Sequence, residues 1–154
     1  MIQVNWEIRR FKELTLDQLY DLLKLRTDVF VVEQHCPYPE LDGKDRHPET
    51  RHILARAGHL ELAAYARVLG PAVHGGNPGF GRVVVNPGFR RRGLSHLLVE
   101  KAVSLVREQW PDRILAIGAQ EYLREFYISH GFEPVSDTYL EDGIPHIDMI
   151  LNPG

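Results

Sequence analysis

The sequence predicts a single α/β domain of the α+β type, in which helices cover the faces of a mixed sheet. A chain of 154 residues, 1–154, has the length of one domain and is long enough to bury a core. Apolar residues alternate with polar ones in several short runs, as in strands, and recur at helical spacing in others. These runs follow one another in the order β-α-β-β-β-α-β-α-β-β, which indicates a sheet with helices packed on it.

The first part of the chain is expected to hold a strand and a helix. Residues 4–11 alternate well enough for a strand. Thr15 and Gln18 then stand at the spacing of a capping box, with Thr at the N-cap and Gln three positions later. Leucines follow at helical intervals, so we expect a helix over about residues 16–31.

A polar, proline-containing segment over residues 33–49 comes next. It is too long for a passive connection, and loops of this kind often carry function. Arg26, on the preceding helix, is expected to pair with an acidic residue of this loop. Residues 52–57 and 60–69 are then predicted as two strands that are joined by a turn at Gly58-His59.

The central stretch combines a strand, a turn and a helix. Residues 80–85 form a β-branched, apolar run that stops at the turn signal Asn86-Pro87-Gly88. A helical pattern begins at Leu94, and residues 90–95 between them read Arg-Arg-Arg-Gly-Leu-Ser. A tight basic turn that opens a helix offers backbone N–H groups and positive charge to a phosphate or pyrophosphate. The alternative is a solvated surface loop in which Gly93 only makes the turn.

The C-terminal part is predicted to add three strands and a short helix. The strands are expected at residues 113–118, 132–140 and 144–151, and the helix at residues 121–129. Gly131 follows the helix at a position typical of a C-terminal cap.

Charge and cysteine content exclude several classes of protein. Against 21 acidic residues stand 18 basic ones, a net charge of −3, so no overall field favours nucleic acid or an anionic membrane. Without a wider basic face, phosphate-directed nucleic-acid binding through Arg90, Arg91 and Arg92 is disfavoured. The one cysteine, Cys36, rules out an internal disulfide and fits a reducing compartment. The N-terminus has no apolar signal region and no run reaches membrane-spanning length, so we expect a cytoplasmic protein.

The strand and turn resemble a known signature. Val83-Val84-Val85-x4-Arg90-x-x-Gly93-x-Ser95 is similar to the acyl-CoA motif of the GNAT superfamily of N-acetyltransferases, Gln/Arg-x-x-Gly-x-Gly/Ala after a strand. The chain departs from it at Arg91, where many members have Gly, and at Ser95, where the motif has Gly or Ala. The resemblance implies a mostly antiparallel central sheet with helices on both faces, and acetyl-CoA as co-substrate.

A second segment, residues 119–133, resembles the later part of the same family. The family's general acid, a tyrosine near the acyl-CoA sulfur, corresponds by position to Tyr127. The resemblance also implies an oxyanion donor from the strand near Val84 or Val85, and Gln120 at the pantetheine arm. By itself, Tyr127 would be read as a packing aromatic. The implied cofactor-binding residues are Val83, Val84, Val85, Arg90, Arg91, Arg92, Gly93, Leu94, Ser95, Gln120 and Tyr127.

Two further segments narrow the resemblance to the ElaA-like branch of the superfamily. They are Leu25-Arg26-x3-Phe30-x-Val32-Glu33-Gln34-x-Cys36-Pro37-Tyr38, with Leu41-Asp42-Gly43-x-Asp45, and Glu141 to Met149 near the end of the chain. The branch implies no particular acceptor.

An ammonium acceptor must lose a proton before it attacks, so a base should lie near the thioester. Glu33, His52 and His146 are the candidates, although a residue of each kind taken alone is more often structural. Asp42 and Asp45 could bind a cationic acceptor or serve as loop caps.

Neither a metal site nor a cysteine nucleophile is expected. His35, Cys36, Asp45 and His47 follow no recognised ligand spacing, so no metal site is assigned. Cys36 has no adjacent Asp or Lys that would activate it as a nucleophile.

The sequence therefore predicts an N-acetyltransferase that moves an acetyl group from acetyl-CoA directly to a primary amine of a small molecule or peptide. The alternative is an acyl-CoA sensor or regulatory protein that binds the cofactor without turnover. Apolar residues near the C-terminal strands could form the interface of a homodimer.

Overall fold

The computed structural model describes residues 3–58 and 61–154. Its strands are β1 (Asn5–Arg9), β2 (Arg51–Ala57), β3 (Glu61–Leu69), β4 (Gly79–Val85), β5 (Leu115–Gln120), β6 (Glu133–Pro134), β7 (Tyr139–Glu141) and β8 (Ile144–Leu151). Its helices are α1 (Leu16–Arg26), the π-helical segment η2 (Thr27–Glu33), α2 (Leu94–Gln109) and α3 (Arg124–Ile128). No helix within this described part is long and apolar enough to cross a membrane.

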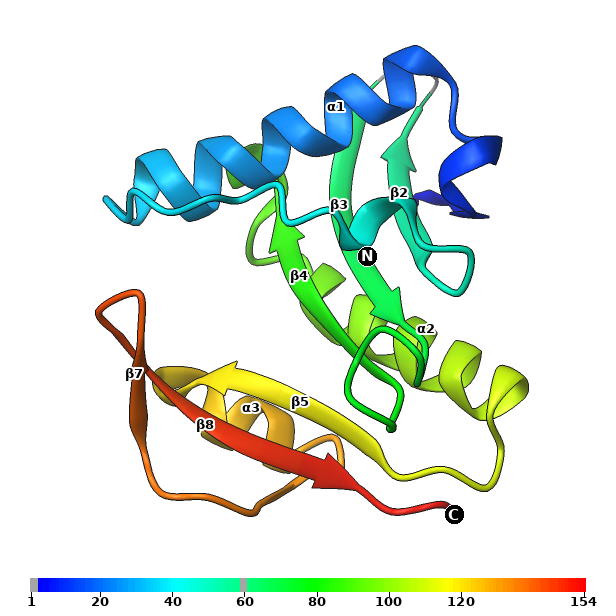
Figure 1. Ribbon diagram of the computed structural model, residues 1–154. Coiled ribbons are helices and arrows are strands. Elements are labelled where there is room, and N and C mark those ends of the chain that lie inside the picture. The colour runs from blue at the N-terminus through cyan, green and yellow to red at the C-terminus, as the bar shows by residue number, and fades with distance from the viewer. Residues whose placement is uncertain (1–2, 59–60) are drawn as a thin grey trace.

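The strands form two antiparallel sheets that meet at one edge. The first has the order β1-β2-β3-β4, and the second has the order β5-β8-β6, with β7 also paired to β8. β4 and β5 start side by side, where the Ala116 N–H donates to the Pro78 carbonyl at 2.9 Å, and then diverge (Figure 1). The predicted GNAT-like arrangement, mostly antiparallel with helices on its faces, is confirmed.

Helices cover the first sheet on opposite faces. Leu22 and Leu25 of α1 pack against Leu54, Tyr65 and Val84 on one face. On the other face, the buried residues of α2 join the larger core, namely Leu94, Leu98, Val99, Ala102, Leu105 and Val106. Each buried leucine contributes about 1.5–3 kcal/mol. The sheet edge at β4 is thus held firmly from both sides.

The helix predicted over about residues 16–31 begins where expected and extends slightly further than expected. The Thr15 side chain accepts from the Gln18 N–H at 3.1 Å, and the Gln18 side chain accepts from the Thr15 N–H at 3.0 Å, as a capping box requires. The helix does not stop near residue 31 but continues to Glu33 with π-helical bonding.

The strand predictions need adjustment at the end of β1 and over residues 132–140. β1 ends at Arg9, because Phe11 begins a 3₁₀ turn. The single strand predicted over residues 132–140 is wrong, since β6 and β7 pair separately with β8. Between them, the Ser136 hydroxyl takes the place of a backbone carbonyl and accepts from the Asp148 N–H at 2.9 Å. Of the turn predicted at Gly58-His59, His59 lies outside the described residues, as does Leu60 of the following strand.

Candidate functional site

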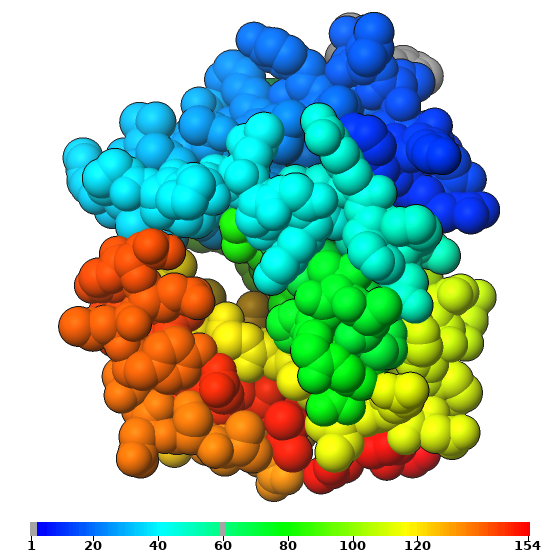
Figure 2. Space-filling view, viewed as in Figure 1, coloured from blue at the N-terminus to red at the C-terminus, as the bar shows by residue number. Residues whose placement is uncertain are grey.

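A cleft of about 1120 Å³ opens where β4 and β5 diverge. Residues 81–85 of β4 and residues 117–120 of β5 form its floor, and residues of η2 and of the following loop form one wall. Figure 2 shows a hollow between the orange segment near residue 140 and the cyan segment near residue 40. This cleft brings together most of the candidate residues, from both halves of the chain.

The basic turn lies at one end of the cleft and leads into α2. The Asn86 side chain accepts from the Gly88 N–H at 3.0 Å, which fixes the start of the turn. Arg91 and Gly93 then adopt left-handed conformations, with φ of 66° and 79°. Because Gly93 is the N-cap and has no side chain, no cap occupies the first N–H groups of α2. A Cβ on Gly93 would meet no atom within 4 Å, so the space over the turn is open.

The three arginines of this turn differ in position. Arg90 forms a bidentate pair with Glu33, with its Nη1 and Nη2 donating at 2.7 and 2.6 Å. Arg91 lines the cleft together with Gly93, Leu94 and Ser95. Arg92 is not among the lining residues; its guanidinium lies 5.6 Å from the centre of the Phe89 ring.

Glu33 lines the cleft from the end of η2, and Gln120 lines it from the end of β5. The hydrogen bonds from Arg90 lower the pKa of the Glu33 carboxyl, which makes this group a weaker base. Gln120, at the end of β5, donates through Nε2 to the Gln34 Oε1 at 3.3 Å.

Tyr127 lies deep in the cleft on α3. Its ring packs against Phe80, Phe126 and Phe132, with centroid distances of 6.2, 5.1 and 5.8 Å. Its side chain is buried, and burial raises the pKa of the phenol above its ordinary value, so the phenol keeps its proton at neutral pH. No residue in the described part of the chain hydrogen-bonds to this hydroxyl, so its proton remains available to a ligand.

His146 faces the same cleft from the start of β8. Its Nδ1 lies 2.7 Å from the Ile144 carbonyl, which can only accept, so Nδ1 carries a proton and, in a neutral ring, Nε2 carries the lone pair. Nε2 lies 3.5 Å from the Glu141 carboxylate, which would stabilise a positive ring. This geometry is that of a base with an orienting partner.

His52 does not line the cleft. It is fully buried in β2, with Nδ1 2.6 Å from the Tyr65 hydroxyl and Nε2 3.1 Å from the Asp45 carbonyl. Both ring nitrogens are therefore engaged away from solvent. In the structure, His52 therefore packs and forms hydrogen bonds inside the protein, whereas the sequence had made it a candidate base.

This burial predicts a pH dependence of folding. Desolvation lowers the pKa of His52 in the folded protein, whereas the unfolded imidazole titrates near about 6.5. Below that pH the unfolded state binds a proton that the folded state does not, so stability falls as pH drops, by up to about 1.4 kcal/mol per pH unit. Urea unfolding between about pH 7 and 5 should show a shallower loss for His52→Gln than for wild type.

Part of this slope should remain in the variant, because burial also lowers the pKa of His74. Asp42 and Asp45 contribute little in this window, because the ordinary pKa of an aspartate, about 3.9, lies below it and the folded protein lowers the pKa of both further. Equal slopes in wild type and His52→Gln would contradict the prediction.

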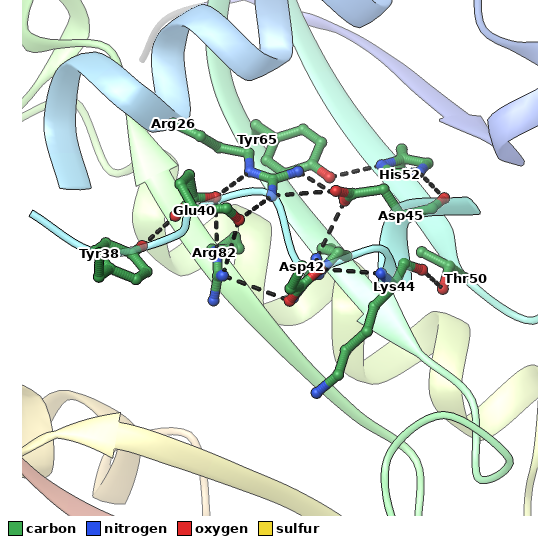
Figure 3. Close-up of polar contacts among 11 residues, drawn as sticks. Arg26, Tyr38, Glu40, Asp42, Lys44, Asp45, Thr50, His52, Tyr65 and Arg82 are labelled. Carbon is green, nitrogen blue, oxygen red and sulfur yellow. Dashed lines mark hydrogen bonds and ion pairs between the residues drawn. The ribbon is translucent and has the colours of Figure 1, made fainter. Parts of the chain in front are cut away.

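Beside the cleft lies a buried network of arginines and carboxylates (Figure 3). As the sequence predicted, Arg26 pairs with acidic residues of the loop, with Glu40 at 2.6 Å and Asp45 at 2.7 Å. Two strand residues also join: Arg67 binds both oxygens of Asp42, and Arg82 binds Glu40 at 2.8 Å. Asp42 and Asp45 thus have arginine partners within the protein.

Sequence reasoning missed Glu40, Arg67 and Arg82. The signal was an arginine inside each of two apolar runs, Ala-Arg-Val and Gly-Arg-Val, where a buried charge requires a partner. The partners come from a loop with no regular pattern, so spacing alone could not identify them.

Comparisons with known proteins agree with this geometry. A family model described as an acetyltransferase (GNAT) domain matches residues 30–153. Protein ElaA of Escherichia coli strain K12 is 43% identical over 152 residues, which cover 95% of each chain. The crystal structure of an acyl-CoA N-acyltransferase from Pseudomonas aeruginosa superposes with a TM-score of 0.92 at 43% identity, over 97% of this chain and 99% of the other. The crystal structure of E. coli ElaA has a TM-score of 0.91 at 41% identity, over 97% and 100%.

Proposed function

Because this chain belongs to the GNAT acetyltransferase family, we propose that it transfers an acetyl group from acetyl-CoA directly to a primary amine of a small molecule or peptide. The observation that carries this proposal is the shared cleft, in which the turn at residues 90–95 and the buried Tyr127 line one cavity. The first can hold a diphosphate, and the second can donate a proton to a thiolate.

In the proposed complex, the turn binds the diphosphate of the cofactor. The uncapped N–H groups at the start of α2 and the Arg91 side chain point to this role. The acyl arm then extends between β4 and β5, along Val83, Val84 and Val85. Gln120 is placed to hydrogen-bond the pantetheine.

The proposed reaction forms a C–N bond and breaks the C–S bond of the thioester. His146 Nε2 accepts a proton from the ammonium group, which frees the lone pair that attacks the carbonyl carbon. A backbone N–H near Val84 or Val85 stabilises the developing oxyanion. Tyr127 then gives its proton to the departing thiolate, and the second proton that the nitrogen loses on becoming an amide restores the phenol. Glu33 is less suited to be the base, because Arg90 lowers its pKa.

Ser95 provides a sharp test of cofactor binding. It lies in the first turn of α2, where a carboxylate favours the helix by about 0.3–1 kcal/mol but repels a diphosphate. Calorimetric titration of wild type with acetyl-CoA should give a dissociation constant in the micromolar range, about −8 kcal/mol. Ser95→Asp should bind at least about tenfold more weakly while remaining as stable as wild type.

Ser95→Ala is the matched control, since it removes the hydroxyl without adding charge and should bind acetyl-CoA nearly as wild type does. Unchanged affinity in Ser95→Asp would contradict the assignment of the turn. Tight binding with no thiol release for any amine would favour the alternative, an acyl-CoA sensor.

A further inference from the structure

The open side of the cleft carries opposite charges on its two walls. Lys44 and Arg82 line one wall, from the loop and from β4. Glu141, the last residue of β7, and Asp142, in the turn to β8, line the other. An acceptor that enters here meets cations on one side and carboxylates on the other.

Arg82 is held in place by Glu40, and its Nη1 group remains as a hydrogen-bond donor that is unused within the described part of the chain. Its Nε and Nη2 donate to the Glu40 carboxylate and carbonyl at 2.8 and 3.2 Å. No described residue accepts from its Nη1, and its side chain is 22% exposed, so this donor is open to a ligand. The residue adopts a left-handed φ of 52°, which costs about 1–2 kcal/mol for a residue other than glycine. The ion pairs hold the guanidinium at the wall against that strain.

Lys44 supplies a positive charge that an anionic ligand could balance. In the adjoining network, the arginines at 26, 67 and 82 face the carboxylates at 40, 42 and 45, so these charges cancel. The Lys44 ammonium has no ion-pair partner within residues 3–58 and 61–154, and Figure 3 shows its side chain extending away from the network. This wall therefore has an excess of one positive charge.

Arg82 lies close to the proposed site of reaction. Arg82 precedes Val84 by two residues on β4, and two residues of strand span about 7 Å. An amine that attacks a thioester beside Val84 would leave a carboxylate a few bonds away within reach of the Arg82 guanidinium. The opposite wall, with Glu141 beside His146, suits the incoming ammonium.

We propose that the acceptor is a small amino-acid-like molecule that carries a carboxylate within a few bonds of its primary amine, with Arg82 and Lys44 binding the carboxylate. This inference rests on the proposed acetyl transfer and narrows its substrate class. It predicts discrimination against the same amine with its carboxylate masked, because a neutral amide neither balances Lys44 nor forms a charge-assisted bond with Arg82.

The test measures thiol release at saturating acetyl-CoA for each of the standard amino acids and for its carboxamide. Wild type should show a KM at least about tenfold lower for the preferred amino acid than for its amide. Lys44→Glu should raise the KM of the amino acid and leave that of the amide nearly unchanged. The amine of an amino acid and the amine of its carboxamide differ in basicity. Dividing the KM of the variant by that of wild type for each ligand removes the effect of this difference.

Lys12→Glu is the matched control, since it reverses an exposed charge away from the cleft and should change neither KM. Equal effects of Lys44→Glu on amino acid and amide would overturn the inference, as would a preference for amines without a carboxylate. In either case, acetyl-CoA binding and turnover would leave the proposed transfer intact. Failure to bind acetyl-CoA, or binding without turnover of any amine, would overturn both.

Discussion

Replacing Arg26 with methionine is expected to lower the free energy of unfolding by about 3–5 kcal/mol. Arg26 has no exposed surface, and it donates to Glu40 through Nε at 2.6 Å and to Asp45 through Nη1 at 2.7 Å. Methionine fills similar space but leaves these carboxylates with fewer cations in a buried site. Urea unfolding at neutral pH measures the loss, which is a large part of the roughly 5–15 kcal/mol of a typical domain.

The remaining arginines cannot fully compensate. Arg82 still contacts Glu40 and Arg67 still contacts Asp45, at 2.8 and 3.2 Å, but three carboxylates would then share two guanidinium groups. Against the effect of burial, Arg26 and Arg67 together hold the pKa of Asp45 below its ordinary range. Removing Arg26 should raise the pKa of Asp45, so this carboxyl can become neutral at acidic pH. The difference in the free energy of unfolding between Arg26→Met and wild type should therefore become smaller as the pH falls.

Lys24→Met is the matched control, because Lys24 and Asp28 form an exposed pair one helical turn apart. Such pairs contribute about 0.3–0.5 kcal/mol, so this variant should remain close to wild type. If Arg26→Met also stays within about 1 kcal/mol of wild type, the network does not carry the buried charges assigned to it.

Elements with local signals were predictable from the sequence. The capping box at Thr15 and Gln18 places the start of α1, and the Asn86 turn places the end of β4 and the approach to α2. In each case, the residues that determine the structure lie within a few positions of one another. The resemblance to a family then predicted that the turn at residues 90–95 and the segment at residues 119–133 form one site. The spacing of residues alone could not predict this.

Features that depend on distant partners were not predictable. The interruption of the strand at 132–140 depends on Ser136 meeting Asp148 across the sheet. His52 and His146 looked equivalent, since each begins a strand. They differ because both ring nitrogens of His52 are buried against Tyr65 and the loop carbonyl of Asp45, whereas the first residues of β8 face the cleft. Only the tertiary arrangement makes that distinction.

Replacing Tyr127 with phenylalanine is expected to lower kcat by about 10²–10⁴-fold, the range for loss of a general acid. Phenylalanine keeps the ring that packs against Phe80, Phe126 and Phe132, so the cleft should retain its shape. Acetyl-CoA affinity, measured by calorimetry, should therefore stay within about threefold of wild type. The loss should appear in thiol release under saturating acetyl-CoA and amine.

Tyr122→Phe separates this role from a general effect of removing a hydroxyl. Tyr122 also lines the cleft, but it is 75% exposed and lies on the short turn before α3, so its loss should leave kcat almost unchanged. Because burial raises the pKa of Tyr127, the wild-type rate should not fall through loss of this proton at mildly alkaline pH. If Tyr127→Phe turns over as fast as Tyr122→Phe, the leaving thiolate takes its proton from water, and Tyr127 serves only to pack the cleft.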